Sequence, residues 1–199
     1  MTEIYLIRHG ETELNSKGVY YGWTDCRLND RGLAQAEELA EILQHVSFDV
    51  VISSTLERAV ETAVIVSGFS RDGIILDERL REMNFGEWEG MHFTDAQKKY
   101  RQEWELWCSD WYKAAPPSGE SLEDMFCRVK SCIDDITEQY RGKKILIVSH
   151  LGSMRIIPLI LLRLSPDFYW SFTAEPGRYS LYEIDEKECC IIKRINSRY

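Results

Sequence analysis

The chain has 199 residues, of which 44% are hydrophobic and 29% are charged, and this length predicts one domain with a substantial core. Its net charge of −9 argues against a nucleic-acid surface, although a local cluster of cations can still bind a small anion. The six cysteines show neither CxxC nor zinc-type spacing, and no signal peptide or membrane-length apolar run is recognisable, which predicts reduced thiols in a cytoplasmic protein.

Strand-like and helix-like segments alternate through the first part of the chain. An apolar run with strand composition ends abruptly in Arg8, His9 and Gly10, which reads as a buried strand followed by a turn. The next predicted elements are a helix with apolar positions Leu33, Ala36, Leu39, Ala40 and Leu43, a strand at 48–53, a helix at 55–66 and a short strand at 74–76.

The last part of the chain returns to the same rhythm. Residues 143–149 predict a strand that is buried on both faces, and residues 179–184 and 189–195 predict a terminal hairpin. Strands that are separated by helices favour right-handed crossovers and parallel pairing. The sequence therefore predicts an α/β fold, a three-layer helix–sheet–helix sandwich with a mostly parallel central sheet.

The middle of the chain departs from this alternation. One helical stripe is rich in aromatic residues and comprises Phe93, Gln97, Tyr100, Trp104, Trp107 and Trp111. The stripe either packs on the core or forms a lid that presents rings to a substrate. Residues 115–119 break this helix, and Ser121 with Asp124 opens the next one as a capping box. We expect one domain over 1–199, with a helical lid at about 91–120.

Two histidines each follow an apolar strand. His9 comes directly after Arg8, and His150 comes after Ser149. Although a lone histidine is more often a core residue, parallel strands would bring both of these to one edge of the sheet. Histidine can act as a nucleophile, an acid or a base near neutral pH, and arginine has a planar charge that suits phosphate. The pattern indicates chemistry on a phosphate ester.

A second arginine lies in the first turn of the helix predicted at 55–66. A helix N-terminus favours an anion, and Arg58 would add a full charge at the same edge of the sheet. The alternative is a surface arginine that pairs with Glu57 or Glu61.

The segment at 80–90 carries several carboxylates. The leaving oxygen of a phosphate monoester needs a proton donor, and a carboxyl group partly removed from water can keep its proton near neutral pH. Spacing alone does not choose among Glu82, Glu87 and Glu89.

A metal site is the main chemical alternative. Ligands could come from His9, His150, Glu82 and Asp25. However, no dense pair such as HxxxH is present, and two arginines would oppose a cation in the same pocket. We therefore expect neither a metal nor a cofactor.

Five motifs, taken in order, resemble those of the histidine phosphatase superfamily, the phosphoglycerate-mutase-like proteins. They span roughly residues 3–160 and together are far more specific than the first alone. The motifs are Leu6-Ile7-Arg8-His9-Gly10-Glu11-Thr12 with Asn15, Tyr21-Gly22-Trp23-Thr24-Asp25, Ser53-Ser54 with Arg58-Ala59, Leu80-Arg81-Glu82 with Phe85-Gly86-Glu87-Trp88-Glu89-Gly90, and Ser149-His150.

The resemblance implies a role for each matching residue. His9 would be the nucleophile that forms a phosphohistidine, and Glu82 would protonate the leaving oxygen and then deprotonate water. The phosphoryl oxygens would be held by Arg8, Arg58 and His150, assisted by Asn15 and by the backbone near Gly22 and Leu151.

One departure from the family pattern concerns the residues after the last histidine. Many members have two glycines there, whereas this chain has Leu151 before Gly152, and we expect the leucine side chain to narrow the pocket. The short length and the Phe-Gly-Glu-Trp-Glu-Gly segment resemble the small phosphatases more than a metabolic mutase.

The sequence therefore predicts a metal-independent phosphatase acting on a small phosphorylated metabolite, as a monomer or homodimer, with no nucleic-acid or membrane partner. Two alternatives remain open. One is a broad-specificity or mutase-like enzyme, and the other is a pseudo-phosphatase that binds phospho-ligands without turnover.

Overall fold

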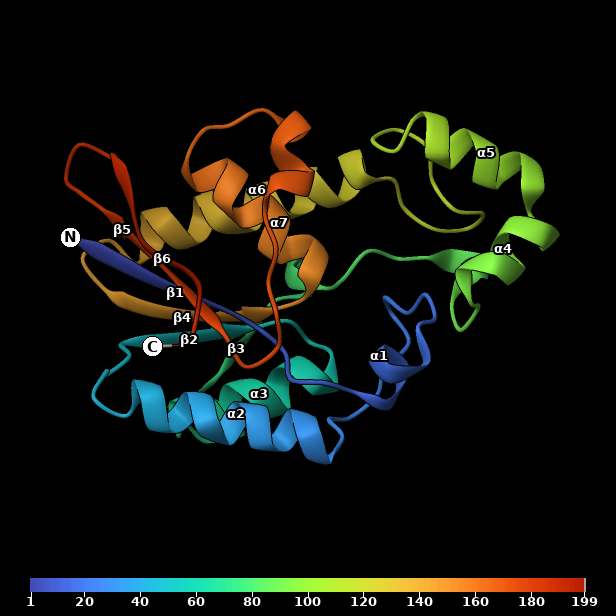
Figure 1. Cartoon of the computed structure of the whole chain (residues 1–199). Coiled ribbons are helices and arrows are strands. Elements are labelled where there is room, and N and C mark those ends of the chain that lie inside the picture. Colours follow the sequence, from blue (N-terminus) through green and yellow to red (C-terminus); the bar gives the residue numbers. More distant parts are fainter. Residues whose placement is uncertain (199) are drawn as a thin grey trace.

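The protein is built on one six-stranded sheet with helices on both faces (Figure 1). The computed structural model describes residues 1–198. The strands lie in the order β3-β2-β4-β1-β5-β6. Their bounds are Thr2–Arg8 for β1, Val50–Ser53 for β2, Ile75–Leu76 for β3, Lys144–Ser149 for β4, Tyr179–Ile184 for β5 and Cys190–Ser197 for β6. Strands β1 to β4 pair in parallel, whereas β5 and β6 are antiparallel, which confirms the mostly parallel sheet.

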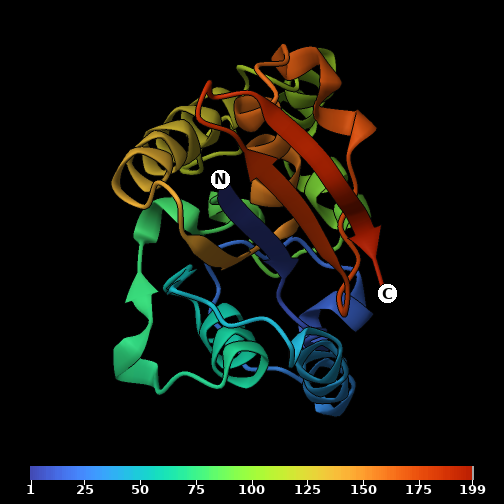
Figure 2. The same cartoon turned by 90° about the vertical axis from the view of Figure 1, so that its left-hand side faces the viewer.

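Two helix layers enclose the sheet, as Figure 2 shows. One layer holds α2 (Asp30–Leu43) and α3 (Glu57–Ser67), and the other holds α6 (Leu122–Gln139) and α7 (Leu151–Leu161). Alternate residues of β1 enter different cores, with Ile4 and Leu6 in the core of α6 and α7 and Tyr5 and Ile7 in that of α2 and α3. This two-sided burial explains why the strand reads as a continuous apolar run.

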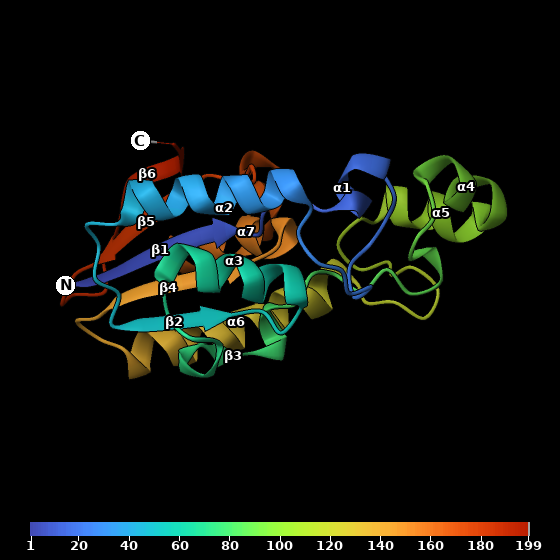
Figure 3. The same ribbon diagram turned by 90° about the horizontal axis from the view of Figure 1, so that it is seen from below.

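The remaining elements are short. They are α1 (Glu13–Lys17), α4 (Phe93–Lys99), α5 (Arg101–Ser109) and the 3₁₀ turns η1 (Arg71–Gly73), η2 (Glu78–Leu80), η3 (Gly86–Trp88) and η4 (Pro166–Ser171). In Figures 1 and 3, α4 and α5 project beyond the carboxyl ends of the parallel strands, with α1 beside them. Among residues 1–198, no helix has the length and apolar composition needed to cross a membrane.

The aromatic segment differs from the single helix that its spacing predicts. The backbone leaves the helical region at Tyr100, which separates α4 from α5, and Trp111 lies beyond the end of α5. Trp104 and Trp107 pack against Tyr20. The stripe therefore contacts Tyr20, directly before the motif that begins at Tyr21. Its last tryptophan, Trp111, instead packs with Tyr169 and Trp170.

Two further predictions concern the buried face of α2 and the first turn of α6. Leu33, expected on the apolar face of α2, is 37% exposed, so the buried face of that helix is narrower than its apolar pattern. The capping box at the start of α6 is present, because Ser121 and Asp124 each accept from the other's backbone N–H.

Candidate active site

Three neighbouring parallel strands end side by side and deliver polar side chains to one edge of the sheet. Arg8 of β1 is in register with Ser149 of β4, and Ser53 of β2 with Val148. The chain continues this pairing past the strands, since the His9 N–H donates to the Ser149 carbonyl at 3.0 Å. The imidazole rings of His9 and His150 consequently lie 5.1 Å apart between centroids, which confirms that the two histidine motifs meet.

The hydrogen bond of His9 determines which nitrogen is available for reaction. His9 is 2% exposed, and its Nδ1 lies 2.7 Å from the carbonyl oxygen of Gly10. Because a carbonyl can only accept, Nδ1 carries the proton and Nε2 keeps its lone pair in the neutral ring. Burial, reinforced by the charges of Arg58 and Arg8, holds the pKa of His9 well below its ordinary value. The imidazole is therefore neutral at neutral pH, with an Nε2 lone pair that a nucleophile requires.

His150 is oriented by a serine at the end of the neighbouring strand. Its Nε2 lies 2.7 Å from Ser54 Oγ, and that oxygen accepts from the Leu56 N–H at 3.4 Å. A hydroxyl that accepts from the backbone can donate its own proton to Nε2, and Nδ1–H then remains as a donor. This Nδ1 is buried without a partner among the described residues. Burial first, and then nearby Arg58, holds the pKa of His150 well below its ordinary value.

Arg58 is fully buried and is held by backbone carbonyls. Its two terminal nitrogens donate to the Gly22 carbonyl at 2.7 Å and the Thr24 carbonyl at 3.0 Å. Its guanidinium carbon lies 4.8 Å from the centroid of the Tyr21 ring. No carboxylate within residues 1–198 pairs with this buried positive charge, which is costly unless an anion binds there.

The alternative reading of Arg58 as a helix-surface arginine is wrong. Glu57 pairs with Arg71, and Glu61 pairs with Arg27. Both glutamates thus bind other cations, while Arg58 turns inward from the first turn of α3.

The N-terminus of α3 is occupied by the protein's own carboxylate. Asp25 Oδ1 accepts from the Glu57 N–H at 2.8 Å, so the expected anion position at this helix end is filled from within the chain. Asp25 is accordingly a cap and does not join the histidines. Among residues 1–198, no group of three or more His, Cys, Asp or Glu side chains is arranged to hold a metal ion.

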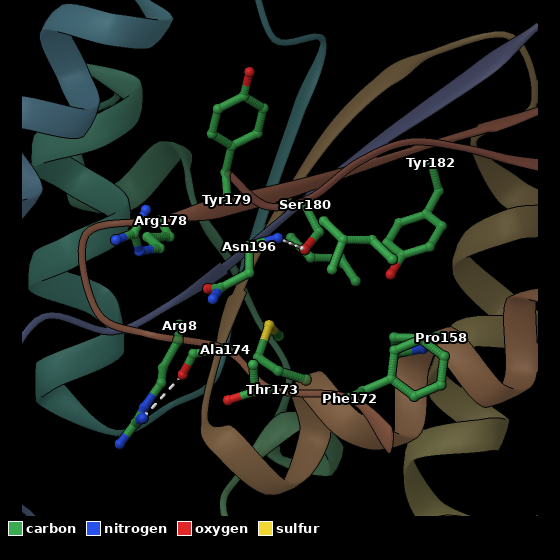
Figure 4. Close-up of a pocket in the computed structure, with 13 residues that line it drawn as sticks. Arg8, Pro158, Phe172, Thr173, Ala174, Arg178, Tyr179, Ser180, Tyr182 and Asn196 are labelled. Atoms are coloured by element: carbon green, nitrogen blue, oxygen red, sulfur yellow. Dashed lines mark hydrogen bonds between the residues drawn. The ribbon is translucent and has the colours of Figure 1, made fainter. Parts of the chain in front are cut away.

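Arg8 approaches the same cavity from the opposite side. Its Nη1 donates to the carbonyl of Ala174 at 3.0 Å, in the loop that precedes β5 (Figure 4). Burial lowers the pKa of Arg8, and this is opposed in part by the charge of Glu82. The Nε atoms of Arg8 and Arg58, like His150 Nδ1, are buried without a hydrogen-bond partner in the described chain. Unpaired buried donors of this kind are suited to the oxygens of a phosphoryl group.

These side chains surround a cavity of about 180 Å³. Its charged groups and His9 lie together with uncharged residues from α1 and the loop that follows it, from the residue before η3 and from the start of α7. The lining residues are Arg8, His9, Asn15, Val19, Tyr20, Tyr21, Arg58, Glu82, Phe85 and Leu151. His150 is not among these lining residues, although its ring contacts that of His9, and Leu151 occupies part of the wall.

Glu82 is the only one of the three candidate glutamates that lines this cavity. Its carboxylate accepts from the Met83 N–H at 2.9 Å, and both of its oxygens lie 3.2 Å from the Gly152 nitrogen. A Cβ added at Gly152 would lie 2.4 Å from Glu82 Oε1. The glycine after Leu151 is therefore required so that the carboxylate can approach the start of α7.

Glu87 and Glu89 have other contacts. The hydroxyl of Tyr100 donates to Glu87 at 3.5 Å. Glu89 accepts from the backbone N–H groups of Gly22, Trp23 and Thr24 at 2.9 to 3.1 Å. Glu89 thereby supports the loop whose carbonyls bind Arg58.

Asn15 and Gly22 take positions that differ in their access to the cavity. Asn15 lines it, with Oδ1 accepting from the Thr12 N–H at 3.0 Å. The N–H of Gly22, which the resemblance implied as a phosphate contact, is bonded to Glu89, and the Gly22 carbonyl accepts from Arg58. Gly22 thus holds Arg58 through its carbonyl, and its N–H is already bonded to Glu89. An added Cβ there would lie 1.6 Å from the Met83 carbonyl oxygen, so glycine is required by the close approach of two loops.

Sequence reasoning assigned no role to several residues that shape the site. Ser54 orients His150, and Thr62 Oγ1 accepts from the Gly10 N–H at 3.1 Å while donating to the Arg58 carbonyl at 2.8 Å. Both lie in or just after the motif that contains Ser53-Ser54 and Arg58-Ala59. The signal for them was the hydroxyl residues themselves, placed where a strand ends and a helix begins.

Comparisons with known proteins agree with this geometry. The model of the histidine phosphatase superfamily (branch 1) matches residues 4–197. The adenosylcobalamin/alpha-ribazole phosphatase of Escherichia coli (strain K12) is 35% identical over 195 residues, covering 98% of this chain and 96% of that protein. Phosphoserine phosphatase 1 of Hydrogenobacter thermophilus is 31% identical over 193 residues, covering 97% and 92%.

A solved structure shows the same likeness. The alpha-ribazole phosphatase from Shigella flexneri matches with a TM-score of 0.93 at 35% identity, covering 98% of this chain and 96% of that one. Family model, relatives and fold together indicate a phosphatase. The chain belongs to the histidine phosphatase superfamily, branch 1.

Proposed function

We propose that this protein hydrolyses α-ribazole 5′-phosphate, a step of cobalamin biosynthesis, through a phosphohistidine on His9. The observation that carries the chemistry is a neutral imidazole with a free Nε2, in a cavity shared with two arginines and one carboxyl group. The substrate is supported by relatives named adenosylcobalamin/alpha-ribazole phosphatase that match over nearly the whole chain.

The first half of the proposed reaction transfers the phosphoryl group to the enzyme. Arg8, Arg58 and the Nδ1–H of His150 bind the phosphoryl oxygens, and Nε2 of His9 attacks phosphorus. The bond to the ester oxygen breaks, and protonated Glu82 gives its proton to that oxygen, so that the product leaves as a neutral alcohol.

The second half regenerates the enzyme. Glu82, now a carboxylate, takes a proton from a water molecule as the water oxygen attacks phosphorus. The bond between phosphorus and Nε2 breaks, and inorganic phosphate leaves with His9 neutral again. The Gly10 carbonyl stabilises the charge that the ring carries while it is phosphorylated, because Nδ1–H donates to it throughout.

Three further assignments belong to the proposal. Asn15 and the backbone at Leu151 assist the phosphoryl contacts from the cavity wall. Residues at about 91–120 act as the lid over the site. Cytoplasmic location is supported by the six cysteines, all of which are free thiols.

A second candidate is a phosphatase for a smaller metabolite such as phosphoserine, because a phosphoserine phosphatase is also among the relatives. A comparative kcat/KM panel distinguishes the two, with α-ribazole 5′-phosphate, phosphoserine, 3-phosphoglycerate and sugar phosphates as substrates. A preference for any of the others would contradict the α-ribazole assignment.

The mechanism is tested by trapping the intermediate. Rapid quenching without acid should leave label from a phosphate-labelled substrate on the wild-type protein, and His9→Ala should remove it. If turnover proceeds without any labelled protein and stops with a chelator, a metal-dependent mechanism holds instead.

A further inference from the structure

The cavity around His9 is lined by two chemically different groups of residues. Arg8, Arg58 and Glu82 carry formal charges, and the rest of the wall carries none. Apart from the Asn15 amide, that wall consists of aromatic and aliphatic side chains. These are Val19, Tyr20, Tyr21, Phe85 and Leu151. Among the described residues, no lysine and no third arginine lines the cavity, so this wall offers no further cation to pair with a second negative charge on a substrate.

Tyr20, one of these uncharged lining residues, is held in place by backbone hydrogen bonds and by ring contacts. Its N–H donates to the Met91 carbonyl at 2.8 Å, and its carbonyl accepts from the Gly90 N–H at 2.7 Å. Its ring centroid lies 4.9 Å from that of Phe85 and 5.7 Å from that of Trp88, which is fully buried. A ring fixed in this way binds a flat partner without losing much conformational freedom.

Two tryptophans of α5 complete the support. The rings of Trp104 and Trp107 each lie 6.2 Å from Tyr20, and Trp107 meets it edge-on at 90°. Neither tryptophan lines the cavity. Trp104 and Trp107, which belong to the aromatic stripe, therefore pack against the ring that contacts the cavity. That ring is Tyr20, which lies outside the stripe.

We infer that Tyr20 and Phe85 form the leaving-group wall, which selects phosphate esters of alcohols bearing a flat apolar ring over esters bearing a second charge. This inference rests on the proposed hydrolysis at His9 and names the class of substrate that the site prefers. An aromatic ring stacks on such a wall, whereas the carboxylate of a small acidic metabolite loses its hydration there without gaining a cationic partner.

A second aromatic cluster provides a matched control. The rings of Trp111, Tyr169 and Trp170 contact one another at 4.9 to 6.0 Å, and Trp170 is 59% exposed. None of these rings lines the cavity in the described chain. Trp170→Ala removes an aromatic group at least as large as that of Tyr20 or Phe85, and it does so at the surface, away from the proposed wall.

The test uses substrate pairs that share the bond to be broken. α-Ribazole 5′-phosphate and ribose 5-phosphate differ in the benzimidazole ring, and 2-phenylethyl phosphate and ethyl phosphate differ in the phenyl ring. The ratio of kcat/KM within a pair reports the ring alone, because effects of folding or of the chemical step cancel. Wild-type protein should favour the ring-bearing member at least about tenfold.

Variants then assign the preference to residues. Tyr20→Ala and Phe85→Ala should each lower both ratios about tenfold, while Tyr20→Phe, which keeps the ring, and Trp170→Ala should retain them. Equal rates within each pair for the wild type, unchanged ratios in Tyr20→Ala, or a loss in Trp170→Ala would overturn the inference.

Binding measurements separate this inference from the proposed function. Calorimetry of both pairs on His9→Ala gives affinity ratios that need no turnover. Wild-type protein that hydrolyses no ester would contradict the proposed function, and the affinity ratios would still decide whether the wall prefers a ring.

Discussion

The close approach of Gly152 to Glu82 yields a prediction whose size follows from the structure. In Gly152→Ala, the new Cβ would lie 2.4 Å from Glu82 Oε1, whereas ordinary contact begins at 3.4 Å. The carboxylate must therefore move by about 1 Å, and displacements of this size in an active site can lower the rate about 100-fold.

The effect on stability should be small by comparison. Alanine in a helix is favoured over glycine by ~1 kcal/mol, and this offsets part of the crowding of Met125, whose Cε would lie 2.9 Å from the new Cβ. We expect the free energy of unfolding to fall by no more than ~2 kcal/mol, as measured by urea denaturation.

The assay compares two classes of leaving group. An alkyl phosphate needs a proton at its leaving oxygen, so its kcat/KM, which reports the first half of the reaction, should fall about 100-fold, whereas 4-nitrophenyl phosphate leaves as a stable anion and its kcat/KM should fall far less. Gly73→Ala is the control, because a Cβ there meets Ser70 and Phe69 at ordinary distances of 3.5 and 3.6 Å. A wild-type kcat/KM on alkyl phosphates in Gly152→Ala, or equal losses of kcat/KM on both classes, would refute the assignment of Glu82 as proton donor.

Two further predictions concern the histidines. Ser54→Ala removes the hydroxyl at His150 Nε2 and should weaken phosphate binding about tenfold, the effect of one lost hydrogen bond to a charged group; calorimetry with inorganic phosphate measures it, and unchanged affinity would exclude this role of Ser54. Because the folded chain keeps His9 and His150 neutral while the unfolded chain binds protons below about pH 6.5, the free energy of unfolding should decrease as the pH falls below that value. The slope is at most ~1.4 kcal/mol per pH unit for each histidine, and urea denaturation between about pH 5 and pH 7 should show a shallower slope for His150→Gln, an equal slope being the contrary result.

Much of the sheet could be predicted because its strands are buried on both faces. In β1 and β4 nearly every side chain enters a core, so their apolar runs are unbroken and their carboxyl ends are easy to locate. The positions of His9 and His150 follow from those strand ends together with parallel pairing.

The loops were harder to predict because distant contacts set their shape. Glu82 could not be separated from Glu87 and Glu89 by spacing. The loop that carries it is held from α6, where Arg128 donates to the carbonyls of Arg81 and Glu82 at 2.8 and 3.0 Å. The aromatic stripe misled for a related reason, since its regular spacing continues through Tyr100, where the backbone leaves the helix. Local periodicity does not report such tertiary contacts.

The place of β1 in the sheet has a consequence for how the chain is made. This strand is synthesised well before its two neighbours, β4 and β5. The carbonyl that holds Arg8 comes from Ala174, 166 residues later. During translation this apolar strand must therefore remain unpaired, which is the situation in which nascent chains depend on chaperones. A ribosome-bound chain stopped before Ala174 would contain both His9 and His150 and still lack the carbonyl that holds Arg8.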